Sequence, residues 1–271
     1  QPLRALYSPT HLVEVERVSD TEARVGFEAS NYLPDVDFEF FYSVAAEKVG
    51  LSLLTYKPAG EDGYFLLLAA PAVEVDTTEA VARDIVLVLD TSGSMEGEKI
   101  EQAKRALGDV LDHLGPEDRF NVIAFSTGIR VFAGDLRPVE ERQQAQQFVA
   151  SLRAGGSTDI HRALQEALSL LGQAGDPQRP AVVFFLTDGL PTVGVTDVEQ
   201  ILASVEQAAP KNLRLFAFGV GYDVNTVLLD SISQRHRGVS AYVQPGQPID
   251  EVVSDLYTQV STPVLFDIQF D

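Results

Sequence analysis

The chain has 271 residues, a formal net charge of −20 at pH 7 and no cysteine. The absence of cysteine excludes disulfide crosslinks, thiolate metal sites and cysteine nucleophiles, and the acidic surface argues against partners with phosphate backbones and against anionic membranes. With 45% hydrophobic and 22% charged residues, the composition is typical of a folded protein with one large domain, or one large and one small domain. The longest apolar stretch, residues 64–75, is interrupted by Pro71 and is shorter than the ~20 residues of a membrane-spanning helix.

The first part of the chain has the pattern of short strands with no helix between them. Residues 36–44 alternate between apolar and polar side chains, which is typical of a strand with one buried face. Turn residues separate further runs of this kind, which predict strands at 11–18, 22–29, 49–56 and 64–70. This succession predicts a β-rich region over residues 1–80 that forms part of a β-sandwich.

Strands and helices alternate from about residue 81 onward. Strands are predicted at 84–89, 119–125, 129–132, 181–186, 213–220 and 239–243, and helices at 98–114, 139–152, 158–171, 197–207, 225–234 and 249–260. The continuous apolar run at 84–89 is typical of a strand buried on both faces, and the strand at 129–132 is expected at an antiparallel edge. The alternation predicts a doubly wound α/β domain over 81–261, whose mainly parallel central sheet is flanked by helices.

The last residues return to a strand pattern. Apolar and polar side chains alternate over 263–270, within the final segment 262–271. Because β-rich pieces then flank the α/β domain on both sides, we expect the last strand to rejoin the N-terminal strands in one β-sandwich-like region. The α/β domain is then an insertion in that region.

Polar side chains lie in three loops that we expect at one edge of the central sheet, because ligands of open α/β sheets bind at the carboxyl ends of the strands. The loop after the first strand of the α/β domain contains Asp90, Ser92 and Ser94. Thr158 lies at the start of the third helix, and Asp188 follows a later buried strand. Hydroxyl and carboxylate oxygens suit Mg²⁺, Mn²⁺ or Ca²⁺, so the sequence predicts one such cation per chain.

Four neighbouring residues are predicted to form the rim of this metal site: Glu96, Gly156, Asp159 and Gly189. The two glycines let the loops turn tightly beside the ion. The two acids would select among ligands by repelling some of them. The alternative for the acids is a structural role at helix starts, where the helix dipole favours negative charge.

The motif Asp90-x-Ser92-x-Ser94, together with Thr158 and Asp188, resembles the metal-ion-dependent adhesion site (MIDAS) of von Willebrand factor type A domains. In that family the hydroxyls of the first motif bind the metal directly, and the aspartates act largely through water. The resemblance implies a non-enzymatic adhesion module, whose ion captures an Asp or Glu carboxylate of a partner protein. It also favours an extracellular or cell-surface location.

Other segments are similar to the inter-alpha-trypsin inhibitor heavy chain family. Residues 8–11, 37–38 and 63–68 resemble the later part of the VIT domain that precedes the A domain there, and 186–194 and 218–225 resemble that A domain. A VIT domain is longer than the β-rich region here, so we expect a partial one. The chain opens on Gln1, which favours an excised piece, and the absence of cysteine favours a bacterial member of the family.

Other interpretations of the motifs stay open. Taken singly, the first motif is also typical of a helix-capping loop, and Ser157 or Thr158 is a plausible helix N-cap. A phosphate loop is disfavoured because 93–99 lacks the required spacing. A hydrolase using Ser92 or Ser94 lacks the usual nucleophile elbow. A structural scaffold with a silent metal site is the main alternative to an adhesion module.

Overall fold

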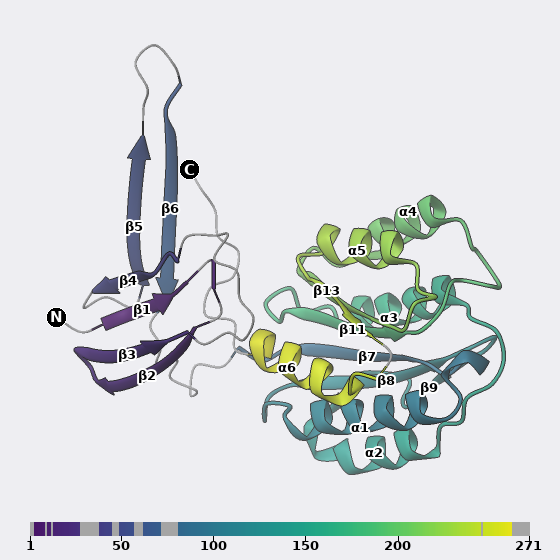
Figure 1. The fold of residues 1–271 in the computed structure, drawn as a ribbon. Helices are drawn as coiled ribbons and strands as arrows, with labels where there is room; N and C mark the ends of the chain where they lie inside the picture. The colour runs from purple at the N-terminus through teal and green to yellow at the C-terminus, as the bar shows by residue number, and fades with distance from the viewer. Residues whose placement is uncertain are drawn as a thin grey trace. The chain divides into compact units, whose positions relative to one another are not determined.

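The computed structural model describes residues 3–8, 10–11, 13–27, 38–44, 49–56, 62–71, 81–244 and 246–261. The chain divides into two compact units, the larger of which is Ala80–Ser261 (Figure 1). The strand predicted at 263–270, and its return to the β-rich region, lie outside the described residues.

The described part of the smaller unit consists of three antiparallel strand pairs. These pairs are β1 (Leu3–Tyr7) with β4 (Phe41–Val44), β2 (Glu14–Ser19) with β3 (Glu22–Gly26), and β5 (Val49–Tyr56) with β6 (Tyr64–Pro71). Strand β1 is not among the predicted strands, because its five residues do not alternate cleanly between apolar and polar side chains. Of the strand predicted at 36–44, residues 36–37 lie outside the described residues; β4 begins at Phe41, and before it the Glu39 amide donates to the Thr10 hydroxyl (3.1 Å). The β-sandwich itself stays a prediction.

A seven-stranded sheet forms the centre of the larger unit, in the order β10-β8-β7-β11-β12-β13, with β9 paired to β8. Its strands are β7 (Asp84–Asp90), β8 (Arg119–Phe125), β9 (Ile129–Val131), β10 (Arg137–Pro138), β11 (Ala181–Thr187), β12 (Leu213–Val220) and β13 (Ser240–Val243). Five neighbouring strands are parallel to one another, in the order β8, β7, β11, β12 and β13. Strands β9 and β10 both run antiparallel to β8. The predicted fold class and the antiparallel edge are confirmed. The two residues of β10 are too few for a periodic pattern.

Helices cover both faces of this sheet (Figure 1). One hydrophobic core contains residues of α1 (Glu98–Asp112), α2 (Arg142–Ser151) and α6 (Ile249–Ser261), and the other contains residues of α3 (Ile160–Ala174), α4 (Val198–Ala208) and α5 (Thr226–Arg235). Single 3₁₀ turns, η2 (Gly93–Met95) and η3 (Val139–Glu141), precede α1 and α2. Within the described ranges, no helix combines the length and apolar character needed to cross a membrane.

Helix α3 starts two residues later than predicted, and its cap differs. The N-cap is Asp159, whose carboxylate accepts a hydrogen bond from the Arg162 amide at 3.1 Å. Neither Ser157 nor Thr158 has that role, so the capping interpretation of these two residues is wrong. Asp159 takes the position because a carboxylate at a helix N-terminus satisfies a free amide and interacts favourably with the dipole.

The middle strand β7 fixes the position of the polar loops. Its residues are all buried, with Ile85, Leu87 and Leu89 in one core and Val86 and Val88 in the other. Each such side chain contributes roughly 1.5–3 kcal/mol by burial, so the end of the strand is firmly held. After β7 the chain continues to β8 on one side, and β11 lies on the other. The order of strands therefore changes direction at β7, where open α/β sheets bind ligands.

Candidate metal centre

Asp90 is the last residue of β7 and is fully buried. Its Oδ1 accepts a hydrogen bond from the Ser92 amide at 2.7 Å, and its Oδ2 accepts one from the Thr187 hydroxyl at 2.6 Å. Burial raises the pKa of Asp90 to about 6, although both hydrogen bonds lower it, and the charge of Asp188 raises it further. The carboxylate is therefore removed from water and held only by neutral donors.

Ser94 lies in η2, the 3₁₀ turn that follows β7, and Ser92 is the N-cap residue of that turn. Their hydroxyl oxygens are 3.1 Å apart, and Ser94 Oγ donates to Asp188 Oδ1 at 2.7 Å. The turn is held by a hydrogen bond from the Met95 amide to the Ser92 carbonyl (3.1 Å) and by the completely buried Met95 side chain. Two hydroxyls of the predicted set thus lie beside each other and beside the second aspartate.

Asp188 follows β11, and its side chain is completely buried. One carboxylate oxygen accepts from Ser94, as above, and the other accepts from Lys99 Nζ at 2.6 Å. The same ammonium group donates to the Ser94 carbonyl at 3.3 Å. Asp188 therefore already has a cationic partner, in contrast to Asp90.

Thr158 is buried in front of α3, and its backbone is fixed by Thr192. The Thr158 amide donates to the Thr192 hydroxyl at 2.9 Å, and the Thr158 carbonyl accepts from the Thr192 amide at 2.9 Å. A Cβ atom placed on Gly189 would lie 3.7 Å from Thr158 Oγ1 and 3.9 Å from Ser94 Oγ. Both hydroxyls therefore border the same small space, which a glycine at 189 keeps open.

Gly156 joins the loop before α3 to the loop after β7. Its carbonyl accepts from the Gly93 amide at 2.9 Å, and the neighbouring Gly155 amide donates to the Thr91 carbonyl at 2.8 Å. Gly156 has φ = +91°, and a Cβ there would lie only 2.9 Å from Thr127 Oγ1. A side chain at this position would be strained and would push the two loops apart.

The two acidic rim residues have different environments. The Asp159 carboxylate caps α3, and a Cβ placed on Gly194 would lie 2.6 Å from its Oδ1. Glu96 is exposed in the turn before α1. Capping is thus the interaction that Asp159 makes, and a role of either acid in ligand selection stays a prediction.

The donor set fits a hard divalent cation. Two buried carboxylates and three hydroxyls converge from three loops, and Lys99 supplies one positive charge for two negative ones. An uncompensated buried charge is destabilising, and oxygen ligands with partial negative charge suit Mg²⁺ or a similar ion. Over the described residues, no cluster of three or more His, Cys, Asp or Glu side chains is arranged to hold a metal. The set found here is of another kind, since most of its donors are hydroxyls.

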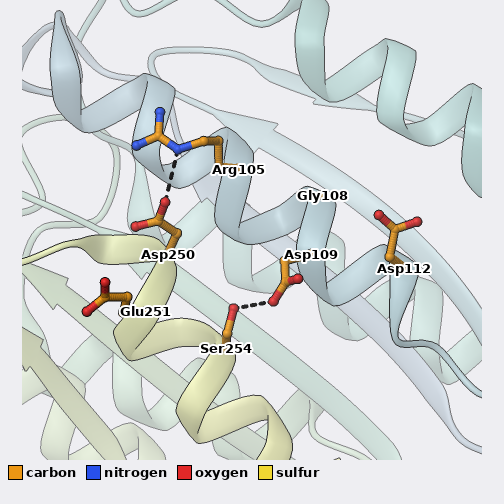
Figure 2. A pocket seen from close by; sticks show the side chains of 7 residues that line it. All are labelled: Arg105, Gly108, Asp109, Asp112, Asp250, Glu251 and Ser254. Carbon is orange, nitrogen blue, oxygen red and sulfur yellow. Dashed lines mark hydrogen bonds and ion pairs between the residues drawn. The ribbon is translucent and has the colours of Figure 1, made fainter.

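A separate pocket lies along α1 and α6 (Figure 2). Arg105 Nε donates to Asp250 Oδ2 at 2.9 Å, and the Ser254 hydroxyl donates to Asp109. The remaining lining residues are Gly108, Asp112 and Glu251. These pairs tie α6 to α1, which is a structural role.

Lys99, Thr187 and Thr192 belong to the centre but were not among the predicted site residues. Thr187 follows Leu186, which pairs with Leu89 in the sheet, so strand register alone places its side chain near Asp90. Lys99 lies in the first turn of a helix, where the dipole disfavours a cation. That unusual position is a signal for a nearby carboxylate.

The fold and this centre define a known class of domain. The sequence profile of the von Willebrand factor type A domain matches residues 84–253, and the chain belongs to this family. Human inter-alpha-trypsin inhibitor heavy chain H2 is 32% identical over 217 residues, which are 78% of this chain and 22% of that protein. Human heavy chain H4 is 33% identical over 218 residues, which are 78% of this chain and 23% of that protein. The chain is homologous to these heavy chains and spans less than a quarter of their length.

Solved structures share the fold at lower identity. A von Willebrand factor type A protein from Catenulispora acidiphila has a TM-score of 0.60 and 23% identity, covering 80% of this chain and 46% of that chain. The ArnB paralog VWA2 from Sulfolobus acidocaldarius has a TM-score of 0.58 and 20% identity, covering 80% and 56%. Proximal thread matrix protein 1 from the mussel byssus, with a zinc-occupied MIDAS motif, has a TM-score of 0.52 and 18% identity, covering 67% and 47%.

Proposed function

We propose that this domain binds one divalent cation and uses it to capture an Asp or Glu carboxylate of a partner protein. The proposed ligands are Asp90, Ser92, Ser94, Thr158 and Asp188, with the aspartates acting largely through water. The observation that carries the proposal is the pair of buried aspartates beside three hydroxyls, with a single ammonium group to balance them. The bound ion would supply the positive charge that receives the partner's carboxylate.

Electrostatics favours such a capture. Neutral hydroxyl ligands leave more of the positive charge on an ion than carboxylates do, and a partner carboxylate then gains a strong charge-assisted contact. The net charge of −20 repels an acidic partner from a distance. Salt screens that repulsion beyond about 8–10 Å, so the attraction of the ion dominates at contact.

The donor chemistry favours Mg²⁺, with Mn²⁺ or Ca²⁺ as alternatives. The related mussel protein holds zinc in its MIDAS motif, which supports a divalent metal in this kind of site. Zinc sites in proteins are usually built with histidine or cysteine, whereas all five donors proposed here are oxygens. An oxygen-only set is typical of the harder cations.

A binding role is proposed rather than a catalytic one. The hydroxyls of Ser92 and Ser94 are hydrogen-bonded to each other and to Asp188. That arrangement is typical of ligands shared around an ion, not of a serine nucleophile beside a histidine base. Von Willebrand factor type A domains are mostly interaction modules, which agrees with this role.

We also propose a domain organisation for the chain. In the proposed organisation, residues 1–80 are a partial VIT-like region, 81–261 are the A domain, and 262–271 return to the β-rich region. The compact unit Ala80–Ser261 supports the first of these boundaries. Proteolysis that releases a stable fragment starting near residue 80 would support it further.

Thermal melting of metal-stripped protein, with and without millimolar MgCl₂, tests the metal site. A cation at about 100 times its Kd adds ~2.7 kcal/mol of stability, and Asp90→Ala should abolish that gain. A wild type that melts identically in both buffers would refute the proposal.

Partner binding with and without EDTA separates capture from a silent metal site. Capture through the ion predicts that EDTA and Asp90→Ala each abolish binding. If the metal stabilises the protein but partner binding ignores EDTA, the site is a structural scaffold and another surface makes the contact.

A further inference from the structure

Lys99 is an unusual residue at the proposed metal centre. It lies in the first turn of α1, which begins at Glu98. The positive end of a helix dipole disfavours a lysine there. A lysine in such a place needs a compensating interaction, and Asp188 provides it.

The ammonium group of Lys99 lies where three loops approach one another. Its Nζ is 2.6 Å from Asp188 Oδ2 and 3.3 Å from the Ser94 carbonyl oxygen. A Cβ atom on Gly221, in the loop after β12, would lie 3.9 Å from the same Nζ. The Lys99 side chain is 41% exposed, while that of Asp188 is completely buried. One positive charge therefore stands at the mouth of the centre and is still reachable from solvent.

The count of charges shows what this lysine changes. Asp90 and Asp188 contribute two negative charges, so a divalent ion alone would bring the centre to zero. With Lys99 included, the loaded centre carries one positive charge. We propose that Lys99 sets this balance: it weakens binding of the cation and strengthens the capture of a carboxylate. This inference rests on the proposed function and concerns the kind of ligand that the loaded site accepts.

The contacts of Asp188 also support this role of Lys99. One of its oxygens accepts from Ser94 and the other from Lys99, so its negative charge is already shared with a fixed cation. A carboxylate neutralised in this way withdraws less positive charge from an ion beside it. The ion keeps that charge for the partner, in a chain whose overall charge is strongly negative.

Matched variants separate charge from structure. Lys99→Met keeps most of the aliphatic stem and removes the charge, Lys99→Gln is a second uncharged change, and Lys99→Arg keeps the charge. Lys104→Met is the control, because Lys104 lies further along the same helix and pairs with Glu101 at 2.9 Å. Circular dichroism and melting in EDTA establish that each variant is folded.

Titration of MnCl₂ by calorimetry gives the first measurement. Removing a repelling charge from a partly exposed position should tighten Mn²⁺ binding by roughly fivefold or more in both uncharged variants. Lys99→Arg should stay within about twofold of the wild type, because it keeps the positive charge, and the control should not change. If the uncharged variants bind Mn²⁺ as weakly as the wild type, or more weakly, the contact between Lys99 and Asp188 has only a structural role.

In the second measurement, N-acetyl-aspartate is added to Mn²⁺-loaded protein and its binding is monitored by the relaxation rate of the water protons. This rate falls when a carboxylate displaces metal-bound water. Both uncharged variants should bind this probe roughly fivefold more weakly than the wild type. Equal affinity in all variants would overturn the inference while leaving metal binding intact. A wild type that takes up no Mn²⁺ would instead refute the proposed function, and the inference with it.

Discussion

Strand β7 begins and ends on a buried aspartate, and the two carboxylates have opposite environments. Asp84, at the amino end, accepts hydrogen bonds from Arg119 Nε at 2.8 Å, Arg119 Nη2 at 2.6 Å and Arg179 Nε at 2.9 Å. Asp90, at the carboxyl end, accepts only from the neutral Ser92 amide and Thr187 hydroxyl. The protein neutralises the first aspartate with its own arginines, whereas the second has only neutral hydrogen-bond donors and is the one that we propose to act at a metal site.

The same arrangement extends along the amino edge of the sheet. Asp118 accepts from the Arg83 amide at 2.9 Å and pairs with the Arg83 guanidinium at 2.6 Å, and that guanidinium also donates to the Tyr257 hydroxyl at 3.4 Å. Burial of a carboxylate is therefore not a sign of a metal site in this fold. What distinguishes the carboxyl edge is the mismatch between its two aspartates and its single lysine.

The largest effect is expected from Asp84→Asn in metal-free buffer. Leaving two arginines next to a neutral amide should destabilise the domain by about 3–5 kcal/mol, the usual result of breaking a buried ion pair. The matched change Asp90→Asn should have the opposite sign. It removes a charge whose burial raises its pKa to about 6, so the metal-free protein should gain on the order of 1–3 kcal/mol at pH 7. Urea unfolding in EDTA measures both; an equal loss in the two variants would abolish the distinction between the edges.

Addition of MgCl₂ should stabilise Asp84→Asn but not Asp90→Asn. Asp84→Asn should keep the full metal-dependent gain, ~2.7 kcal/mol at about 100 times the Kd, because the amino edge has no part in metal binding. Asp90→Asn should lose it, since an amide cannot supply the negative charge that the ion needs. Melting curves at several MgCl₂ concentrations measure the gain. Retention of the full gain in Asp90→Asn would remove Asp90 from the proposed site.

Sequence patterns predict strand β7 and the positions of the two aspartates at its ends, but not the side chains that contact these aspartates. The apolar run of β7 identifies a strand buried on both faces, and the alternation of parallel strands and helices then predicts that Asp90 and Asp188 lie at one edge of the sheet. The arginines that neutralise Asp84 lie 35 and 95 residues away along the chain. Isolated charges carry no periodic signal, so the sequence motif identifies Asp90 as a candidate ligand but does not identify the arginines that neutralise Asp84.

Most of the predicted site residues lie at or just after the ends of parallel strands, and Thr158 lies just before helix α3. The structure brings Asp90, Ser92, Ser94, Thr158 and Asp188 together at that edge. Contacts made by long side chains escape that reasoning. The reach of Lys99 to Asp188 depends on the direction of its side chain, which spacing along the chain does not give. The cap of α3 was misplaced for a similar reason: several neighbouring polar residues can cap, and backbone geometry chooses among them.

A smaller effect on stability is expected from a substitution in the loops that meet at the carboxyl edge of the sheet. Gly156→Ala should destabilise the domain by about 1–3 kcal/mol, because its φ of +91° disfavours a side chain, and its Cβ would press on Thr127. Gly97→Ala is the control, since Gly97 has φ = +88° and no atom within 4 Å of the added Cβ. Metal affinity should fall only in Gly156→Ala, because only that change separates the loops that carry the ligands. Calorimetry with MnCl₂ measures the affinity; equal losses in both variants would mean that backbone strain alone is responsible.

The smallest effect tests an ionisable group outside the metal centre. Burial lowers the pKa of His236, an effect that Arg235 reinforces and Glu206 opposes. Because the folded pKa lies below the unfolded value of about 6.5, the unfolded chain binds more protons as the pH falls through that value, and stability decreases. His236→Gln should remove this part of the acid-side loss. Unfolding free energies between pH 7.5 and 5 in EDTA, taken as differences from the wild type, give the comparison. Parallel pH profiles for His236→Gln and the wild type would show that this ring makes no contribution.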